Sequence, residues 1–434
     1  MKQIKRLLLL VILLMPLLAQ AADKEVLARL QALPGVSDVQ ELKSTAYDNK
    51  YVLNITQEVD PIRHQAGSFK QRVIVCHVGY DRPTVLVTEG YDCNYALREG
   101  YREELSKLLN ANLVFVEYRY FDKSTPSPCN WNYLTVENSL YDLHHVNQTF
   151  HQLYNGKWIA TGISKGGQTC MFYRVFFPDD VDLSVPYVAP LNKSLEDGRH
   201  EPFIERQVST AANRQHVKDF QVEVLKRKAR LMPMFQKFCE SKGYTFRVPL
   251  EDIYDYCVLE YSFAIWQWGT PMAQIPDAKA SDKDIFDNII KITDPNYFSD
   301  QTPYLSFNVQ AARELGYYGY DVKPFKKWMS IKTAKDYMHR VMLPEQFAGL
   351  KFDKALYNKT IDWLKHNDQK MIYIYGGIDP WGASGVAGLK CLKDKKLIKV
   401  YVLPGGSHAT RIGSFPEPTR TEIINLIHRY LETN

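Results

Sequence analysis

Short apolar runs of strand length alternate with segments of helical spacing from residue 84 to residue 188, and this alternation constrains the fold most strongly. Thr84–Thr88 and Leu113–Glu117 are apolar or β-branched runs, and the segment 95–109 between them has apolar residues at helical spacing. The pattern continues with a run at 157–163, a helical segment and a run at 183–188. Alternating strands and helices are typical of a parallel sheet covered by helices. The sequence therefore predicts an α/β fold with a mostly parallel sheet.

The alternation is interrupted once, after the sixth predicted strand. Two earlier runs, at 52–56 and 72–77, supply the first two strands. Residues 190–367 are mostly helical and irregular, and a long charged helix is predicted at 216–237. The pattern then returns with two strands and a closing helix, at 371–375, 398–403 and 420–431. We predict a core domain at 22–189 and 368–434, with a helical insertion at 190–367 between its sixth and seventh strands.

The N-terminus has the three parts of a secretory signal peptide. Lys2, Lys5 and Arg6 form a basic region, Leu7 to Leu18 is apolar, and Ala-Gln-Ala at 19–21 fits the small-x-small cleavage pattern. The alternative is an uncleaved anchor, but the apolar run is shorter than the roughly 20 residues that a membrane span needs. We expect cleavage near Ala21 and export of the mature chain, to the periplasm or the medium, without stable membrane insertion.

Composition and charge exclude several classes of protein. The chain has 434 residues, of which 45% are hydrophobic and 24% charged, which is typical of a globular protein and not of a collagen-like, coiled-coil or disordered one. Lys and Arg number 54 against 49 Asp and Glu, and they form no basic run that could follow a phosphate backbone. Nucleic acid is therefore not an expected partner.

The cysteines and histidines form no recognisable metal motif. None of the seven cysteines belongs to a C-x-x-C pair, and His200-Glu201 is not followed by the second histidine of a zinc peptidase. We therefore expect no metal and no cofactor. Because export would favour disulfides, Cys239 with Cys257 and Cys93 with Cys129 are candidate pairs, and the odd count leaves at least one free thiol.

A serine stands at the junction of a predicted strand and a predicted helix. The sequence Gly-Ile-Ser-Lys-Gly-Gly at 162–167 follows a β-branched run and opens a helical segment, which is the context of a nucleophile elbow. The glycines remove side chains that would collide across such a turn. Ser164 is thus the candidate nucleophile, and the backbone N–H of Lys165 is a candidate oxyanion donor. The alternative is a glycine-rich turn without a catalytic role.

An acid and a base follow the next two strands in the order that this elbow requires. A serine hydroxyl needs a histidine base steered by a carboxylate, and the chain order for this fold is Ser, Asp or Glu, then His. Asp379 follows the strand at 371–375 in a glycine- and proline-rich turn, and His408 follows the strand at 398–403 in a similar turn. We predict a triad of Ser164, Asp379 and His408. The alternative is that the two loop residues serve only as caps.

A second oxyanion donor is expected in the loop after the third predicted strand. That loop is Thr-Glu-Gly-Tyr-Asp at 88–92, where Gly90 permits a close backbone approach. The N–H of Tyr91 is the candidate donor. Glu89 could be a buried structural carboxylate instead.

Seven motifs give the chain a resemblance to a known peptidase family. They are Thr-Glu-Gly-Tyr at 88–91, Val-Glu-Tyr-Arg-Tyr-Phe at 116–121, Asn-Trp-Asn-Tyr-Leu-Thr at 130–135, the elbow at 162–167, Trp-Gln-Trp-Gly at 266–269, Gly-Gly-Ile-Asp-Pro-Trp at 376–381 and Gly-Ser-His at 406–408. Over most of its mature length the chain resembles the secreted proline-specific tri- and tetrapeptidyl aminopeptidases. These are serine peptidases related to the prolyl carboxypeptidase and dipeptidyl peptidase group. Tyr118 and Asp122 depart from the family pattern, which has His and often Gly there.

The resemblance implies an α/β-hydrolase core with a helical lid formed by the insertion. It also implies that short peptides are released from N-termini by cleavage after proline. A carboxylic-ester hydrolase with the same triad and a peptide-binding pseudoenzyme are the alternative functions. The oligomeric state and the length of the released peptide stay open.

The substrate suggests further binding residues. A rigid proline ring favours flat aromatic faces, so Trp268 and Trp381 are candidates for the proline pocket, although either could be a core aromatic. An aminopeptidase must hold an ammonium group, which calls for a carboxylate. Glu137, at the start of a predicted helix, is the candidate, with Glu196 and Asp197 as rivals. The alternative for Glu137 is a charge that complements the helix dipole.

Overall fold

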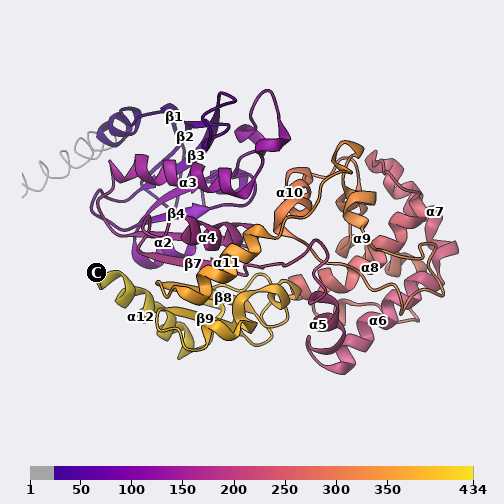
Figure 1. The fold of residues 1–434 in the computed structure, drawn as a ribbon. Helices are drawn as coiled ribbons and strands as arrows, with labels where there is room; N and C mark the ends of the chain where they lie inside the picture. Colours follow the sequence, from indigo (N-terminus) through magenta and orange to yellow (C-terminus); the bar gives the residue numbers. More distant parts are fainter. Residues whose placement is uncertain (1–23, 434) are drawn as a thin grey trace, which may run out of the picture. The chain divides into compact units, whose positions relative to one another are not determined.

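The computed structural model describes residues 24–433, so the predicted signal peptide at 1–21 lies outside the described residues. Figure 1 shows the helices and strands of these residues, and the chain divides into two compact units. Of the described residues, 24–162 and 176–184 form the first unit, and 163–175 and 185–433 form the second. In the part of the chain that is described, no helix is long and apolar enough to cross a membrane.

The first unit contains the N-terminal part of a mixed sheet. Its strands follow the order β1-β2-β3-β5-β4-β6. Antiparallel pairs join β1 to β2, β2 to β3 and β3 to β5, whereas β4 pairs parallel with both β5 and β6. The strand bounds are Val36–Glu41, Asn49–Glu58, Ser68–His77, Thr84–Thr88, Asn112–Val116 and Trp158–Ile163 for β1 to β6. The predicted strands of this region are confirmed, and β1 is an additional one.

One helix of the first unit lies where the sequence predicts it, and one predicted helix is divided in the structure. The long helix α3 (Val136–His151) occupies the segment where a helix is expected. The helix expected at 95–109 is wrong as a single element, because a 3-10 turn at Asn94–Leu97 and α2 (Glu104–Leu109) share that segment. The carboxylate of Glu103 accepts hydrogen bonds from the N–H groups of Leu105 and Ser106, which starts α2 afresh.

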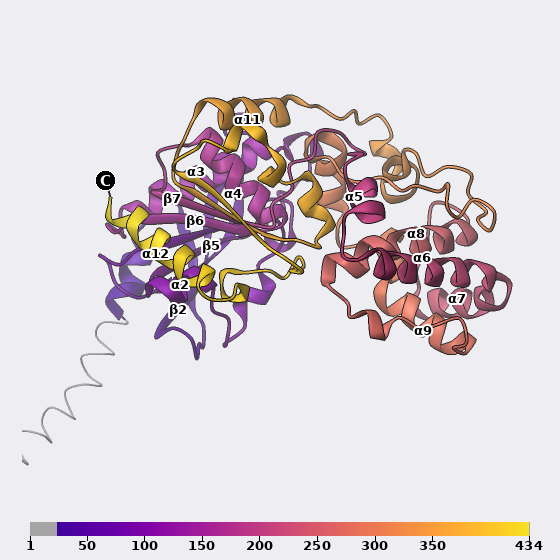
Figure 2. The same cartoon turned by 90° about the horizontal axis from the view of Figure 1, so that it is seen from below.

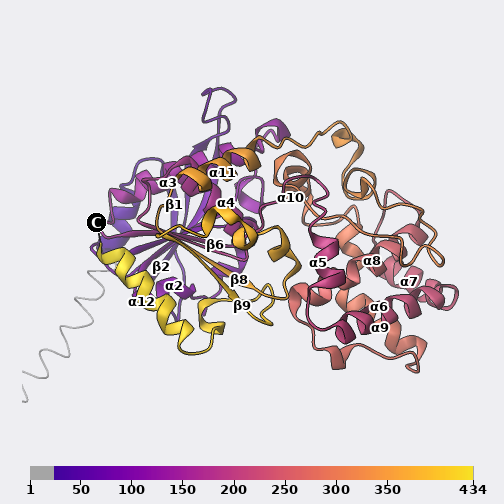
Figure 3. The same ribbon diagram turned by 60° about the horizontal axis from the view of Figure 1, so that its bottom comes forward.

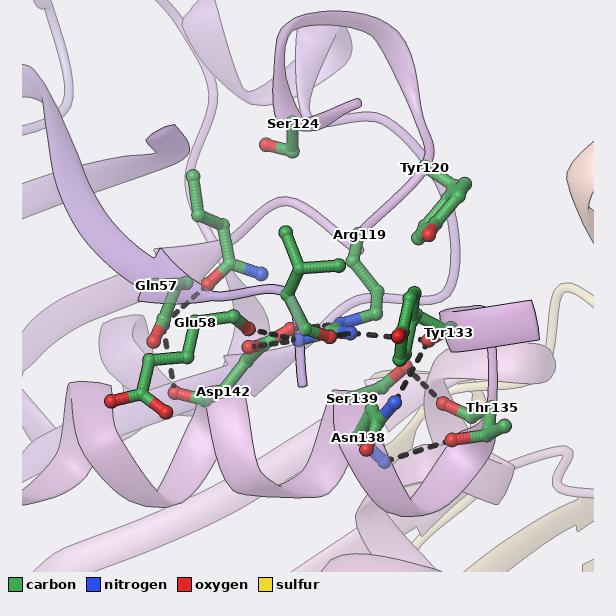
Figure 4. A network of polar contacts seen from close by, with 12 residues as sticks. Gln57, Glu58, Arg119, Tyr120, Ser124, Tyr133, Thr135, Asn138, Ser139 and Asp142 are labelled. Atoms are coloured by element: carbon green, nitrogen blue, oxygen red, sulfur yellow. Dashed lines mark hydrogen bonds and ion pairs between the residues drawn. The ribbon is translucent and has the colours of Figure 1, made fainter. Parts of the chain in front are cut away.

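A fully buried arginine fastens the parts of the first unit together (Figure 4). The guanidinium of Arg119 forms two hydrogen bonds, of 2.6 and 2.7 Å, with the buried carboxylate of Asp142 in α3. Its remaining donors reach the carbonyls of Glu58, Val59 and Tyr133. A buried charge requires such partners, so this pair fixes α3 against the end of β2 and the loop before α3.

We predict that Arg119→Met destabilises the protein by about 3–5 kcal/mol, because it leaves the Asp142 carboxylate buried without its partner. The matched control is Lys157→Met, which removes a partly exposed ion pair with Asp182 and should cost about 1 kcal/mol or less. Urea unfolding of both variants measures the difference. Equal losses in the two variants would contradict the anchoring role of Arg119.

The second unit contains the C-terminal strands and the nucleophile-bearing helix. The strand order here is β7-β8-β9, with β7 (Leu183–Tyr187) beginning in the first unit. The strands β8 (Met371–Gly376) and β9 (Ile398–Leu403) pair parallel along their full length, as Figure 3 illustrates. Helix α4 (Lys165–Phe176) follows the elbow, and α12 (Thr419–Glu432) closes the chain. The α/β class predicted from the sequence is confirmed.

The chain between β7 and β8 is helical, as predicted. Its principal helices α5 to α11 are His200–Arg206, Ala211–Lys226, Lys228–Lys242, Leu250–Trp268, Asp282–Ile292, Leu305–Gln310 and Ala355–His366. Helices α6 to α9 pack together into one helical cluster (Figure 2). Because the additional strand β1 shifts the numbering, the predicted sixth and seventh strands correspond to β7 and β8. The boundaries of a lid domain at 190 and 367 stay a prediction.

Two details of the insertion differ from the sequence expectations. The single helix expected at 216–237 is wrong, since α6 ends at Lys226 and α7 begins at Lys228. Arg227, with φ of −86° and ψ of 4°, departs from helical geometry between them, and its guanidinium binds the carbonyls of Ala278 and Ala280 and the carboxylate of Asp282, more than fifty positions along the chain.

The candidate disulfides are also wrong, since all seven cysteines are free thiols. Cys93 is buried whereas Cys129 is exposed, so the two do not share an environment. Cys239 and Cys257 are both buried, and this burial raises the pKa of the Cys239 thiol to about 12 and that of Cys257 well above its usual value. Such thiols hold little thiolate, the form that reacts.

Candidate active site

Ser164 occupies the turn between β6 and α4 in a left-handed backbone conformation, with φ of 58°. This conformation is uncommon for a residue with a side chain, and it persists only where the surroundings enforce it. The N–H of Ser164 donates to the carbonyl of Tyr187 at 2.9 Å, and its carbonyl accepts the first helical bond, from Gln168, at 2.8 Å. The elbow geometry predicted from the sequence is therefore present. Lys165 follows it as a buried residue at the start of α4.

Asp379 is held in a tight turn directly after β8. It caps the 3-10 turn Pro380–Ser384, and its Oδ1 accepts a hydrogen bond from the N–H of Trp381 at 3.1 Å. The turn requires Gly376, because a Cβ there would lie 2.2 Å from the carbonyl oxygen of Ser407. The side chain of Asp379 is fully buried, so its second oxygen needs a partner as well.

His408 provides that partner. Its Nδ1 lies 2.6 Å from Oδ2 of Asp379, and only 5% of its side chain is exposed. A carboxylate accepts hydrogen bonds, so Nδ1 carries the proton and Nε2 is left as the basic nitrogen. The structure thus joins the two predicted loop residues after β8 and β9, in the same unit as Ser164.

The C-terminal end of α8 supports the histidine loop. The N–H of His408 donates to the carbonyl of Gln267 at 2.8 Å. Trp268 packs edge-to-face on the imidazole, with ring centroids 5.8 Å apart, and is 61% exposed. Gly269 ends α8 with φ of 65°, and a Cβ on it would lie 2.9 Å from Cβ of Ser407. Of the two predicted aromatic residues, Trp268 is therefore the one that presents an open face beside His408.

Trp381 lies in the core instead of on an open face. It is 8% exposed and packs against four aromatic rings with centroids 5.2–5.6 Å away, those of His200, Phe263, Tyr317 and Tyr318. This cluster joins the helical insertion to the turn that carries Asp379. The environment favours the core alternative for Trp381, and its role in a proline pocket stays a prediction.

His200 is a positioning residue that the sequence analysis did not find. It is fully buried, its Nδ1 lies 3.0 Å from the carbonyl of Pro380, and its Nε2 lies 3.2 Å from Oδ1 of Asn192. Burial lowers the pKa of His200 to about 4, so the ring is neutral at pH 7. A neutral histidine bound to the residue after Asp379 fixes the acid turn without adding charge. No sequence pattern indicated this role, because the sequence showed only that His200 does not belong to a zinc motif.

Three predicted residues belong to the first unit. Glu137 is exposed in the first turn of α3, a position where its charge complements the helix dipole. Tyr91 is half-buried and packs edge-to-face on Phe121, and its carbonyl accepts from the N–H of Tyr118 at 3.0 Å. Glu89 is buried and accepts a 2.6 Å hydrogen bond from the hydroxyl of Tyr95, as a structural carboxylate would.

The rival carboxylates Glu196 and Asp197 are already engaged within the second unit. Asp197 is fully buried and binds the guanidinium of Arg199 at 2.6 Å and the N–H of Lys193 at 2.8 Å. Although burial opposes it, these partners hold the pKa of Asp197 below its usual value. Glu196 accepts a hydrogen bond from the N–H of Asp336. Neither carboxylate is therefore a ready partner for a substrate cation.

The described residues contain no group of three or more His, Cys, Asp or Glu side chains that could hold a metal ion. The second unit holds Ser164 together with the hydrogen-bonded pair of His408 and Asp379. An imidazole backed by a carboxylate can activate a serine hydroxyl beside it for attack on a carbonyl carbon.

Comparison with known proteins defines the family. The chain matches the family described as PS-10 peptidase S37 over residues 19–422, and it belongs to this family. It is therefore a serine peptidase, and the family resemblance noted from its motifs is confirmed.

Several of the curated relatives are named for action at proline. Over 415 residues the chain is 28% identical to the prolyl tri/tetrapeptidyl aminopeptidase of Streptomyces mobaraensis, covering 93% of this chain and 84% of that protein. It is 28% identical over 163 residues to the human lysosomal Pro-X carboxypeptidase, covering 33% and 32% of the two chains. Among solved structures it is similar to a proline iminopeptidase of Mycobacterium smegmatis, with 11% identity, a TM-score of 0.40 and coverage of 91% and 99%.

We predict that Gly269→Ala impairs peptidase activity far more than stability. The new Cβ forces Ser407 aside, and a shift of about 1 Å at a reacting group can cost roughly 100-fold in rate. The matched control is Gly243→Ala at the end of α7, where φ is 68° but nothing lies within 4 Å of the new Cβ. Both variants carry the same backbone strain, about 1–2 kcal/mol. Similar kcat/KM values for the two variants on a peptide nitroanilide would contradict this support of the histidine loop.

Proposed function

We propose that this protein is an exported serine exopeptidase that releases tri- or tetrapeptides from N-termini by cleavage after proline. The observation that carries the catalytic part is the buried 2.6 Å hydrogen bond between His408 and Asp379, in one unit with the left-handed turn at Ser164. The N-terminal sequence pattern supports export. The relatives that are named for action at proline support the specificity.

In the proposed mechanism, Ser164 Oγ attacks the scissile carbonyl carbon while His408 Nε2 accepts its proton. Asp379 keeps the imidazole in the right tautomer and stabilises the imidazolium that forms. The N–H of Lys165 is the proposed oxyanion donor, because it follows the nucleophile at the start of α4. The second donor, the N–H of Tyr91, remains a prediction.

The tetrahedral intermediate then collapses as His408 returns its proton to the leaving amine. This step breaks the C–N bond and leaves the peptide esterified to Ser164. Water then attacks that ester with His408 as general base. This step releases the peptide with a free carboxyl group and regenerates the Ser164 hydroxyl. The residues described here supply every proton transfer in this cycle.

The open indole face of Trp268 is the proposed contact for the proline ring. Trp268 lies beside His408, where the residue that donates the scissile carbonyl must sit, and it is largely exposed. A flat aromatic face suits a pyrrolidine ring, which offers no N–H to bind. A lid formed by residues 190–367, as the sequence predicts, would supply the remaining walls of the site.

We expect Ser164→Ala to lower kcat on the order of 10⁴-fold or more, and Asp379→Asn to lower it by a similar order through the wrong imidazole tautomer. A fluorophosphonate probe should label the wild-type protein at Ser164 and fail to label Ser164→Ala. Chelators should leave the activity unchanged. Equal labelling of the two proteins would contradict the nucleophile assignment, and turnover of nitrophenyl esters without cleavage of any proline peptide would favour the esterase alternative.

We expect acetylation of the N-terminus of a tri- or tetrapeptidyl-proline substrate to reduce kcat/KM by at least about tenfold. Acetylation removes the cation and adds bulk, so one charged contact is lost. Paired measurements on free and acetylated peptides of one sequence test this. If both peptides are cut equally well, the exopeptidase proposal fails and an endopeptidase takes its place.

A further inference from the structure

A cavity of about 370 Å³ lies within the helical insertion of the second unit. Helices α5, α6 and α8 and the chain after Tyr318 form its walls. Its lining combines acidic, basic and aromatic side chains, among them Glu201, Lys218, Phe263, Trp266 and Tyr320. A cavity of this size can enclose a small ligand or the end of a peptide.

The carboxylate of Glu201 is the unsatisfied polar group in this cavity. Its Oε2 is shielded from solvent and has no hydrogen-bond partner. Space for the carboxylate depends on Gly319, because a Cβ at that position would lie 2.8 Å from Oε1. Glu201 lines the cavity and is half-buried, so a donor in the cavity can approach its carboxylate, and Oε2 gains a partner there once the side chain turns toward the cavity.

The charges around Glu201 favour a cationic donor. Burial raises the pKa of Glu201, and the nearby carboxylates of Glu196, Asp321 and Asp197 raise it further. A positive group that enters here would be attracted by Glu201, Glu196 and Asp321, whereas the charge of Asp197 is already balanced by Arg199.

In the described part of the chain, the two basic side chains of the cavity wall, Arg214 and Lys218, do not form an ion pair with Glu201. Arg214 is engaged by two carbonyls, those of Val208 and Ser209, at 2.8 and 2.9 Å. Lys218 also lines the cavity, but within residues 24–433 it forms no ion pair with Glu201. Both cations therefore leave the Glu201 carboxylate available.

Helix α8 connects this cavity to the histidine loop. Phe263 and Trp266 face the cavity, and the carbonyl of Gln267 holds the N–H of His408. With a rise of 1.5 Å per residue, Phe263 and Gln267 are separated by about 6 Å along the helix axis. An extended tripeptide spans about 10 Å and a tetrapeptide about 14 Å. The cavity therefore begins within the reach of a peptide that has its third or fourth residue at the histidine.

We propose that Glu201 binds the N-terminal ammonium group of the substrate peptide and that this cavity encloses the first residue. The assignment rests on the proposed exopeptidase function, which it deepens by naming the group that recognises the chain end. It replaces Glu137, Glu196 and Asp197, the carboxylates considered from the sequence. The bound ammonium would give the Glu201 carboxylate a partner, with the side chain turned so that Oε2 faces the cavity, and the position of Glu201 would limit how many residues precede proline.

The decisive experiment measures binding, in the uncleaving Ser164→Ala background, of the peptide Ala-Ala-Pro-Ala-amide with a free or an acetylated N-terminus. We expect Glu201→Gln to weaken binding of the free peptide by at least about tenfold and to leave the acetylated peptide nearly unaffected, because the charge pair is already absent there. Glu205→Gln is the matched control, since Glu205 also lines the cavity but is exposed and paired with Arg206. It should change binding less than about twofold.

Thermal unfolding of the variants checks that a loss of binding is not caused by a loss of folded protein. Glu201→Gln removes no existing hydrogen bond from Oε2, so it should not lower the unfolding temperature. Equal weakening of both peptides, no effect on either, or no measurable binding of the free peptide would overturn the assignment. Loss of binding on Lys218→Met together with dependence on a free C-terminal carboxylate would also overturn it, since the cavity would then hold the opposite end of a peptide.

Kinetic measurements distinguish a failure of this inference from a failure of the proposed function. In the active enzyme, Glu201→Gln should reduce kcat/KM for free-amine substrates by the same factor as binding and leave acetylated ones unchanged. If the wild type cleaves no proline peptide while the binding difference persists, the proposed cleavage specificity fails and the ammonium site stands. If proline peptides are cleaved but Glu201→Gln is indistinguishable from Glu205→Gln, the site fails and the function stands.

Discussion

The hydrogen bond between two buried groups, the carboxylate of Asp379 and the imidazole of His408, is the interaction on which the rest of the site depends. Both oxygens of Asp379 are used, one by His408 at 2.6 Å and one by the N–H of Trp381 at 3.1 Å. Because a buried carboxylate is costly without such partners, the two loops must meet with little freedom. Gly376 permits that meeting, since its missing side chain leaves room for the carbonyl of Ser407. The pair is thus a product of backbone packing at the ends of β8 and β9.

Local chemistry explains which parts of the fold could be predicted from the sequence. The strands β4, β5 and β8 are buried along their whole length, so their apolar runs are plain, and the turn at Ser164 follows from glycines at a strand-to-helix junction. Features that depend on distant or exposed residues were missed. The guanidinium of Arg227, at the break between α6 and α7, binds carbonyls more than fifty positions away, and β1 is a partly exposed edge strand with no apolar run.

The same distinction applies to the site. Ser164, Asp379 and His408 could be predicted because each follows a strand in the order that the chemistry requires. The partner of a substrate cation could not, because a carboxylate is available only if no neighbour has already engaged it. Asp197 and Glu196 look equivalent in the sequence, yet one is bound by Arg199 and the other by a backbone N–H from residue 336. Only the folded chain distinguishes them from Glu201, whose Oε2 lacks a partner.

The helical insertion of the second unit contacts both of the loops that carry Asp379 and His408. Helix α5 reaches the acid turn through the bond of His200 to the carbonyl of Pro380, and α8 reaches the base through the bond of Gln267 to the N–H of His408. The ring stack of Phe263 on Tyr318, 3.7 Å apart, joins these helices to Trp381 behind Asp379. A rigid-body movement of α5 or α8 would therefore break contacts to the two residues that must stay aligned. If Glu201 binds the substrate ammonium as proposed, the limit on peptide length is then set by the geometry between two points tied to these helices, because Glu201 belongs to α5 and His408 is bound to α8.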